Sequence, residues 1–272
     1  MTLSKLSRRS VVGLLFFLSA FFCHVLFSVA EDKSKIKLGV MEGEEATIWR
    51  VAAEEAKKAS LDIELVYFSD YTLLNGAVNA GDLDANAFQH TAYLENQIEQ
   101  YGYQLSIAGN TFVTPIGIYS RKIKNIKELS DKASVGIPND PSNAGRALRL
   151  LHSLGVIKLK DSKNILASPL DIIENPKRLK IREMDAGLLG RSISDFDIVI
   201  VNTNWALVTK LDVHKDAIAW EKTENNPYNN IIVVHANNKD KPWVKKLVAA
   251  YNNESVRAKI QEIFGTIAQT SW

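Results

Sequence analysis

The stretch Gly136 to Leu151, GIPNDPSNAGRALRLL, holds the residue types best suited to binding an anion. Its apolar start predicts the end of a buried strand, and a helix is expected to begin at Asp140 and Pro141, since proline favours the first helical position. A helix start exposes unpaired N–H groups that attract anions. Arg146, one turn further on, adds a planar fork that matches a carboxylate. On this stretch alone, a surface ion pair between Arg146 and Asp140 explains the arginine slightly better than an external ligand does.

A second polar stretch, GDLDANAFQHTAYL over residues 81–94, combines acids, an amide and a histidine: Asp82, Asp84, Asn86 and His90. These types could form a metal cluster or an acid–base pair. No second histidine and no cysteine lies nearby, which argues against zinc, and we expect no metal site. With Phe88 and Tyr93 beside it, His90 is typical of a pocket wall. A capped helix start with a hydrogen-bonded histidine explains the stretch equally well.

Two further stretches, VNTNW (201–205) and NNPYNN (225–230), place amides next to aromatic rings. An amide offers both a donor and an acceptor, so Asn202 and Asn230 could bind either end of a zwitterion. Taken singly, such residues are more often turn formers. No GxSxG, HExxH or P-loop pattern occurs, and no Ser or Cys has a recognisable base beside it. We therefore predict a protein that is not an enzyme and that carries no cofactor.

The elements that must position these residues alternate along the chain. Apolar strands are expected at 36–41, 62–68, 133–138, 196–202 and 229–235, with helices near 45–59, 71–80 and from 140 onward, and a helical tail over 242–264 interrupted near 252–253. Such alternation predicts an α/β sheet with helices on both faces. The polar clusters follow strand ends, which is where open α/β sheets bind ligands.

The first thirty residues have the composition of an export signal. Lys5, Arg8 and Arg9 precede an apolar run over 11–22, and small residues end the segment at Ala30. A retained membrane anchor is the alternative, although the run is short for a span of about 20 residues. We predict a signal peptide over 1–30 and a periplasmic location.

Cys23 is the only cysteine, so no intramolecular disulfide can form. It is a candidate for lipid attachment to a membrane, but the bulky Phe21 and Phe22 precede it where lipid-attachment motifs carry small residues. The formal net charge is +2, and the three basic residues of the first thirty leave 30 basic against 31 acidic residues in the remainder. This balance argues against nucleic acid as a partner.

The polar clusters closely resemble those of the MetQ/NlpA family of methionine-binding proteins, which serve ABC importers. The matching segments include FSDY, GDLDANAFQHTAYL, GNTFVTPIGIYSRKIKNIKEL, IPNDPSNAGRALRLL, DIVIVNTNWA and NPYNNIIVV, in family order from about residue 36 to the C-terminus. The resemblance implies a periplasmic-binding-protein fold of type II: two α/β lobes, each a mixed sheet flanked by helices, with the ligand in the cleft between them. The implied lobes span 31–115 with 206–272, and 116–205.

The resemblance also assigns roles. Arg146 is implied to bind the ligand carboxylate, and Asn202 and Asn230 to hold the ammonium and carboxylate ends. Further binding residues carried over from the family motifs are Phe68, Tyr71, Asn86, His90, Tyr93 and Asn143. The aromatic residues and His90 are implied to surround the thioether, which suits an apolar, polarisable pocket. The implied protein is a monomer that delivers methionine to an ABC permease and ATPase complex.

The chain departs from the family pattern at Ala92, where proline is usual, at Trp205, where tyrosine is usual, and in DAGLLGR over 185–191. These departures leave the ligand open among L-methionine, D-methionine, an analogue or another small amino acid. Two other functions also stay open: an interaction or adhesion lipoprotein without transport, and an enzyme that uses His90 with Asp82 or Asp84.

Overall fold

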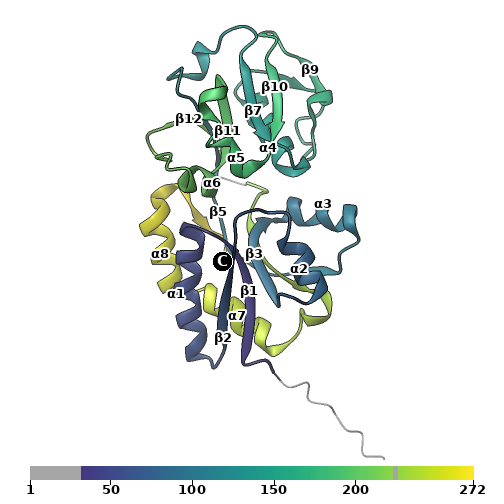
Figure 1. Ribbon diagram of the computed structural model, residues 1–272, viewed down its shortest axis with the longest axis vertical. Helices are drawn as coiled ribbons and strands as arrows, with labels where there is room; N and C mark the ends of the chain where they lie inside the picture. The colour runs from purple at the N-terminus through teal and green to yellow at the C-terminus, as the bar shows by residue number, and fades with distance from the viewer. Residues whose placement is uncertain (1–31, 223–225) are drawn as a thin grey trace, which may run out of the picture. The chain divides into compact units, whose positions relative to one another are not determined.

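Strands that end in polar residues build two mixed five-stranded sheets in the computed structural model, which describes residues 32–222 and 226–272 (Figure 1). The predicted signal peptide and Cys23 lie outside the described residues. No helix within the described ranges is long and apolar enough to cross a membrane. The two-lobed α/β fold expected from the resemblance is confirmed.

The first sheet has the strand order β2-β1-β3-β13-β4. Its members are β1 (Lys35–Met41), β2 (Asp62–Phe68), β3 (Ala85–His90), β4 (Leu105–Asn110) and β13 (Asn230–His235). β1 pairs in parallel with β2 and β3, whereas β13 is antiparallel to β3 and β4. The carboxyl ends of the three parallel strands therefore meet at one edge, where FSDY begins at the last residue of β2 and FQH forms the end of β3.

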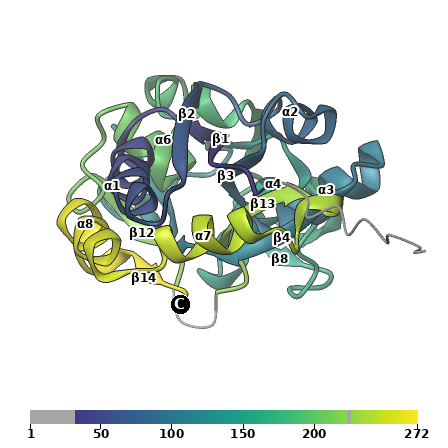
Figure 2. The ribbon, with the colours of Figure 1, turned by 90° about the horizontal axis from the view of Figure 1, so that it is seen from below.

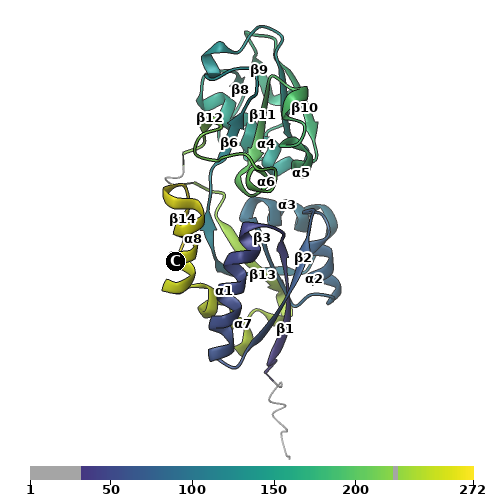
Figure 3. The ribbon, with the colours of Figure 1, turned by 60° about the vertical axis from the view of Figure 1, so that its left-hand side comes forward.

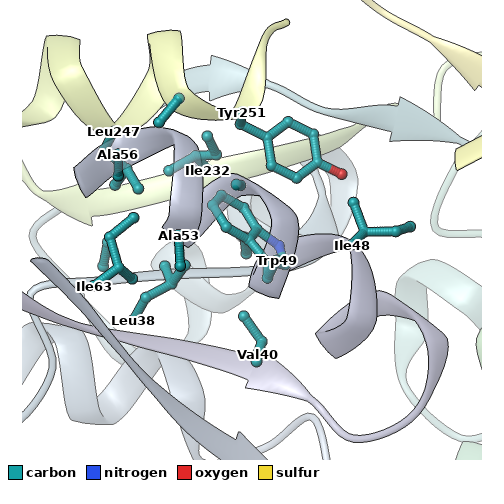
Figure 4. Packing of buried hydrophobic residues seen from close by; sticks show 14 of the residues in the cluster. Leu38, Val40, Ile48, Trp49, Ala53, Ala56, Ile63, Ile232, Leu247 and Tyr251 are labelled. Atoms are coloured by element: carbon teal, nitrogen blue, oxygen red, sulfur yellow. The ribbon is translucent and has the colours of Figure 1, made fainter. Parts of the chain in front are cut away.

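Helices cover both faces of this sheet. On one face are α1 (Glu44–Lys58), α7 (Pro242–Tyr251) and α8 (Glu254–Phe264), and on the other are α2 (Leu74–Ala80) and α3 (Thr91–Tyr101) (Figure 2). β13 serves both cores, because successive side chains of a strand point to opposite faces. Ile232 packs with Trp49 and Tyr251 under α1 and α7 (Figure 4), whereas Ile231 packs in the core beneath α2 and α3.

The second sheet has the order β10-β7-β11-β6-β12 and repeats this plan (Figure 3). Its members are β6 (Ile116–Tyr119), β7 (Ser134–Pro138), β10 (Lys180–Met184), β11 (Ile198–Asn202) and β12 (Ala217–Trp220). β7 is parallel to β10 and β11, and β6 is antiparallel to β11 and β12. Three helices belong to this part of the chain: α4 (Pro141–Ser153), α5 (Ala186–Leu189) and α6 (Thr203–Val208). Two short ladders complete the strands, β5 (Phe112–Val113) with β14 (Gln269–Thr270) and β8 (Lys158–Leu159) with β9 (Ile172–Glu174).

The second sheet extends beyond the predicted lobe boundary at residue 205. β12, which the prediction grouped with the first lobe, pairs with β6 instead, and the Trp220 ring packs edge-on against Tyr119 at 5.9 Å between centroids. The second sheet therefore ends later in the chain than the predicted lobe boundary, because β12 is a short edge strand whose sequence gives no strong strand signal. The chain thus passes between the sheets once after β5 and once after β12.

The helix expected at Asp140 and Pro141 forms as α4. The Asp140 carboxylate caps it by accepting the Asn143 N–H at 2.9 Å, and Pro141 occupies the first turn. The apolar face of α4 is buried at Ala147, Leu150 and Leu151. The interrupted tail also forms as predicted, with α7 ending at Tyr251 and α8 starting at Glu254.

Candidate ligand-binding site

A cavity at the polar strand ends collects side chains from both sheets. It encloses about 430 Å³ of space not filled by atoms, its opening to solvent included. Its wall comprises Glu45, Tyr71, Phe88, Gln89, His90, Tyr93 and Asn230 from the first sheet and its connections, Asn143, Arg146, Asn202, Thr203 and Asn204 from the second, and Thr114 and Pro115 from the segment between β5 and β6.

Arg146 is buried, with only 4% of its surface exposed, although it lies off the apolar stripe of α4. Its Nε donates to Glu221 Oε2 at 2.9 Å, and its Nη2 donates to the same oxygen at 2.5 Å and to the Thr114 carbonyl at 2.7 Å. The surface ion pair with Asp140 is therefore wrong. Asp140 is occupied in capping α4, and the arginine pairs with a carboxylate 75 residues further along the chain.

One face of the Arg146 guanidinium is covered by Tyr228, whose ring centroid lies 4.4 Å from the Arg146 Cζ. Tyr228 is itself held by a hydrogen bond from Arg149 to its hydroxyl at 2.8 Å. Among the described residues, the Arg146 Nη1 has no hydrogen-bond partner. Arg146 lines the cavity, whereas Glu221 and Tyr228 do not. Glu221 and the stacked Tyr228 ring therefore hold the guanidinium on the side that faces away from the cavity.

A chain of hydrogen bonds joins the two lobes across the cavity. The Asn143 Nδ2 donates to Asp140, and the Asn143 Oδ1 accepts from the Asn202 Nδ2 at 2.8 Å and contacts the His90 Nε2 at 3.2 Å. Every polar atom of the Asn143 side chain is thus in use. Asn143 therefore orients His90 and Asn202, and all of its polar side-chain atoms are occupied before any ligand arrives.

His90 is a neutral member of this chain. Its Nδ1 accepts the Tyr93 backbone N–H at 3.1 Å, so the remaining proton is on Nε2 and is donated to the Asn143 Oδ1. Burial lowers the pKa of His90 to about 3, and the charge of Arg146 acts in the same direction. An uncharged imidazole at the end of β3 leaves Arg146 as the only cation on the described wall.

The amides leave one acceptor open. The Asn202 Oδ1 is buried and has no hydrogen-bond partner among the described residues. A buried carbonyl oxygen without a donor costs free energy, on the order of 1–3 kcal/mol. Such a group is expected to gain a partner when a ligand with N–H groups enters the cavity.

Aromatic rings form the opposite part of the wall. Tyr71 lies 5.6 Å from Phe88, 6.0 Å from Tyr93 and 5.4 Å from Trp205 between ring centroids. The Tyr71 hydroxyl donates to the Asn204 Oδ1 at 2.8 Å, which connects the two lobes a second time. Burial raises the pKa of Tyr71 and of Tyr93, so both rings stay uncharged.

The structure brings together most of the residues predicted for the site: Tyr71, His90, Tyr93, Asn143, Arg146, Asn202 and Asn230 all line the cavity. Phe68 and Asn86 are not on its wall. The Phe68 ring packs among apolar residues behind the wall. Asn86 is fully buried and bonds Asn75, Gln89 and the Leu74 carbonyl, so it ties β3 to the start of α2.

Seven wall residues were absent from the predicted set. Phe88 and Gln89 belong to the FQH motif, Thr114 and Pro115 to TFVTPIG, and Thr203 and Asn204 to VNTNW, so the motifs themselves could have indicated them. Glu45 had no such signal, because an acid in the first turn of a helix usually faces solvent. No cluster of three or more metal-ligating side chains occurs within residues 32–222 and 226–272.

Comparisons with known proteins give matches that agree with one another and cover most of the chain. The family model described as NlpA lipoprotein matches residues 36–272. The D-methionine-binding lipoprotein MetQ of Escherichia coli K12 is 46% identical over 245 residues, covering 89% of this chain and 90% of the relative. A nutrient binding protein from Burkholderia cenocepacia bound to methionine superposes with a TM-score of 0.85 at 46% identity, covering 87% of this chain and 100% of that one. The methionine binding protein MetQ superposes with a TM-score of 0.84 at 45% identity, covering 88% and 98%.

Proposed function

Because the chain belongs to the NlpA lipoprotein family, we propose that it is an extracytoplasmic binding protein that captures methionine and delivers it to an ABC transporter. It binds and releases its ligand without chemistry. The observation that carries the proposal is the pairing, on one cavity wall, of a buried guanidinium with an open Nη1 and a buried amide oxygen without a donor.

In this proposal the ligand carboxylate binds the Nη1 of Arg146. Glu221, Thr114 and Tyr228 already hold the other edge and one face of the guanidinium, so little side-chain entropy remains to be lost on binding. Asn230, whose side chain has no hydrogen bond within the described residues, supplies further donors from β13. The ammonium group donates to the Asn202 Oδ1.

The thioether side chain then lies against Tyr71, Phe88 and Tyr93. Sulfur makes favourable contacts with aromatic rings, worth about 0.3–1.5 kcal/mol each, and the uncharged His90 adds no competing charge. Trp205, which replaces the tyrosine usual in the family, packs on Tyr71 from outside the cavity. It therefore affects ligand choice through the position of Tyr71.

We propose that residues 32–115 with 226–272 and residues 116–221 form the two lobes. Hydrogen bonds that join these lobes, among them Tyr71 to Asn204, His90 to Asn143 and Arg149 to Tyr228, break when the lobes open and re-form when they close. We also propose export with removal of the N-terminal segment. Mass spectrometry of the native protein tests this: a start at Cys23 with lipid, or at residue 31 without it, supports export, and an intact Met1 refutes it.

Titration calorimetry of refolded, ligand-stripped protein with L- and D-methionine tests the binding function. The variant that removes the clamp is Arg146→Met combined with Glu221→Gln, because Arg146→Met alone would leave Glu221 half-buried without its cation. Losing a charged hydrogen bond of about 1.5–3 kcal/mol is expected to weaken binding about 10- to 150-fold. Arg50→Met, at an exposed position of α1, is the matched control and should bind as the wild type does.

Unchanged affinity in the double variant would refute the assigned role of Arg146. A stripped wild-type protein that shows no heat and no thermal shift with either enantiomer, or with any other amino acid, would refute the function itself. Delivery is tested separately, by methionine uptake into vesicles that contain the cognate permease and ATPase, with and without the binding protein.

A further inference from the structure

Glu45 is an unpaired carboxyl group on the cavity wall. It lies in the first turn of α1, is 7% exposed, and has no hydrogen-bond or ion-pair partner among the described residues. Its exposed neighbour Glu44 has the place in solvent that is usual for an acid at a helix start. Burying a carboxyl group without a partner costs free energy, so the position of Glu45 on the cavity wall requires an explanation.

Burial alone raises the pKa of Glu45 to about 8, so the group is protonated at neutral pH when the cavity is empty. Burial raises the pKa values of Tyr71, after β2, and of Tyr251, on α7, and the charge of Glu45 acts in the same direction. Both hydroxyls stay neutral at physiological pH.

The charged residues on the other elements packed against α1 are already paired or exposed. Lys35 of β1 pairs with Glu64 of β2, and Lys246 of α7 pairs with Asp32. On α8, Arg257 pairs with Glu254 and Lys259 with Glu262. Lys37, Asp62, Lys245 and Glu44 are exposed, and α6 carries no ionisable side chain. No cation of the described chain therefore compensates Glu45.

The wall is thus built with one cation and one acid. Arg146 is the cation, and Glu45 is the only carboxyl group among the wall residues. Glu45 perturbs Tyr71, and Tyr71 bonds Asn204, two residues from the open Asn202 Oδ1. Glu45 thus lines the same cavity as Asn202, the amide proposed for the ammonium group.

We propose that Glu45 binds the ammonium group of the amino acid and gives up its own proton to solvent as the ligand enters. The inference rests on the proposed function and specifies how that site recognises a zwitterion. An ammonium group has three N–H bonds, so the Asn202 Oδ1 accepts one and Glu45 accepts another. The incoming positive charge stabilises the carboxylate, and the proton leaves to the buffer.

This proposal makes binding depend on pH in a defined direction. Below pH 8 each bound ligand must displace a proton, so affinity rises with pH, by up to about tenfold per unit, and levels off near pH 8. The other wall residues with perturbed pKa values cannot produce this effect, because His90 is already neutral and Tyr71 and Tyr93 titrate above the range.

Calorimetry in buffers of different ionisation enthalpy counts the protons released. For the wild type at pH 7, with methionine as the probe, we expect about one proton released per ligand and affinity rising up to about tenfold from pH 6 to pH 7. Glu45→Gln, which keeps the shape, should release none and show no pH dependence. The matched control Glu44→Gln should behave as the wild type does.

Methionine binding by the wild type without proton release, or with a release that persists in Glu45→Gln, would overturn the inference and leave the proposed function standing. A wild type that does not bind methionine overturns both. Thermal unfolding of Glu45→Gln and of Glu45→Ala checks that each variant is folded, and loss of the released proton in both supports the role.

Discussion

The burial of Glu45 has a consequence for folding that requires no ligand. The carboxyl has a pKa of about 8 in the folded protein against 4.5 for an unperturbed glutamate. Below pH 4.5 both states hold the proton, and its contribution to stability is fully present. Between pH 4.5 and pH 8 only the folded state holds the proton, so the free energy of unfolding falls as pH rises.

Each unit of pKa difference corresponds to about 1.4 kcal/mol. From pH 5 to pH 7 the wild type should therefore lose about 3 kcal/mol relative to a variant without this titration. Glu45→Gln is that variant, because an amide keeps the shape and never ionises. We expect it to be about as stable as the wild type near pH 4.5 and about 3 kcal/mol more stable at pH 7.

Urea unfolding of ligand-stripped protein at pH 5, 6, 7 and 8 measures this difference. Glu44→Gln, one residue earlier on the same helix and exposed, should follow the wild type at every pH. A stability difference between Glu45→Gln and the wild type that stays constant over this range would refute the reasoning, because it would mean that Glu45 ionises alike in the folded and unfolded states.

Three further predictions concern residues that support the site. Gly145→Ala should destabilise the protein by about 1–3 kcal/mol, because a Cβ there would lie 2.3 Å from the Ile165 carbonyl oxygen, a backbone atom that cannot yield; an unchanged urea midpoint would contradict this. Trp49→Ala should cost about 3–5 kcal/mol, measured in the same way, since the ring is 2% exposed beneath α7. Asp197→Ala should lower the melting temperature at pH 7 and lower it less at acid pH. The Ser134 N–H and hydroxyl and Lys122 hold the pKa of Asp197 below its usual value, so the stabilisation by its carboxylate is lost as pH falls. An equal fall in melting temperature at both pH values would count against that assignment.

Local chemistry made much of this protein readable from its sequence. The cap at Asp140, the proline that opens α4 and the break between α7 and α8 depend on residues within a few positions of one another. Strands β1, β2, β7, β11 and β13 are predictable for the same reason, since their apolar runs are short and bounded by turn residues. Strands β3, β4, β6, β10 and β12 were not among the expected strands. The resemblance to a known family added the two-lobed arrangement, which local periodicity does not contain.

Contacts between distant segments were decided only by the tertiary structure. Arg146 pairs with Glu221 because β12 joins the second sheet, an edge-strand pairing that the sequence does not indicate. Phe68 and Asn86 are not on the wall: the Phe68 ring packs in the apolar cores, and Asn86 lies four residues before the carboxyl end of β3, where it bonds α2. Glu45 looks like an ordinary first-turn acid along the chain, and only the packing of α1 against the cavity removes it from water. The sequence by itself thus determined the elements and the motifs that follow them, whereas the charges in the cavity depend on desolvation and partners that exist only once both lobes have folded.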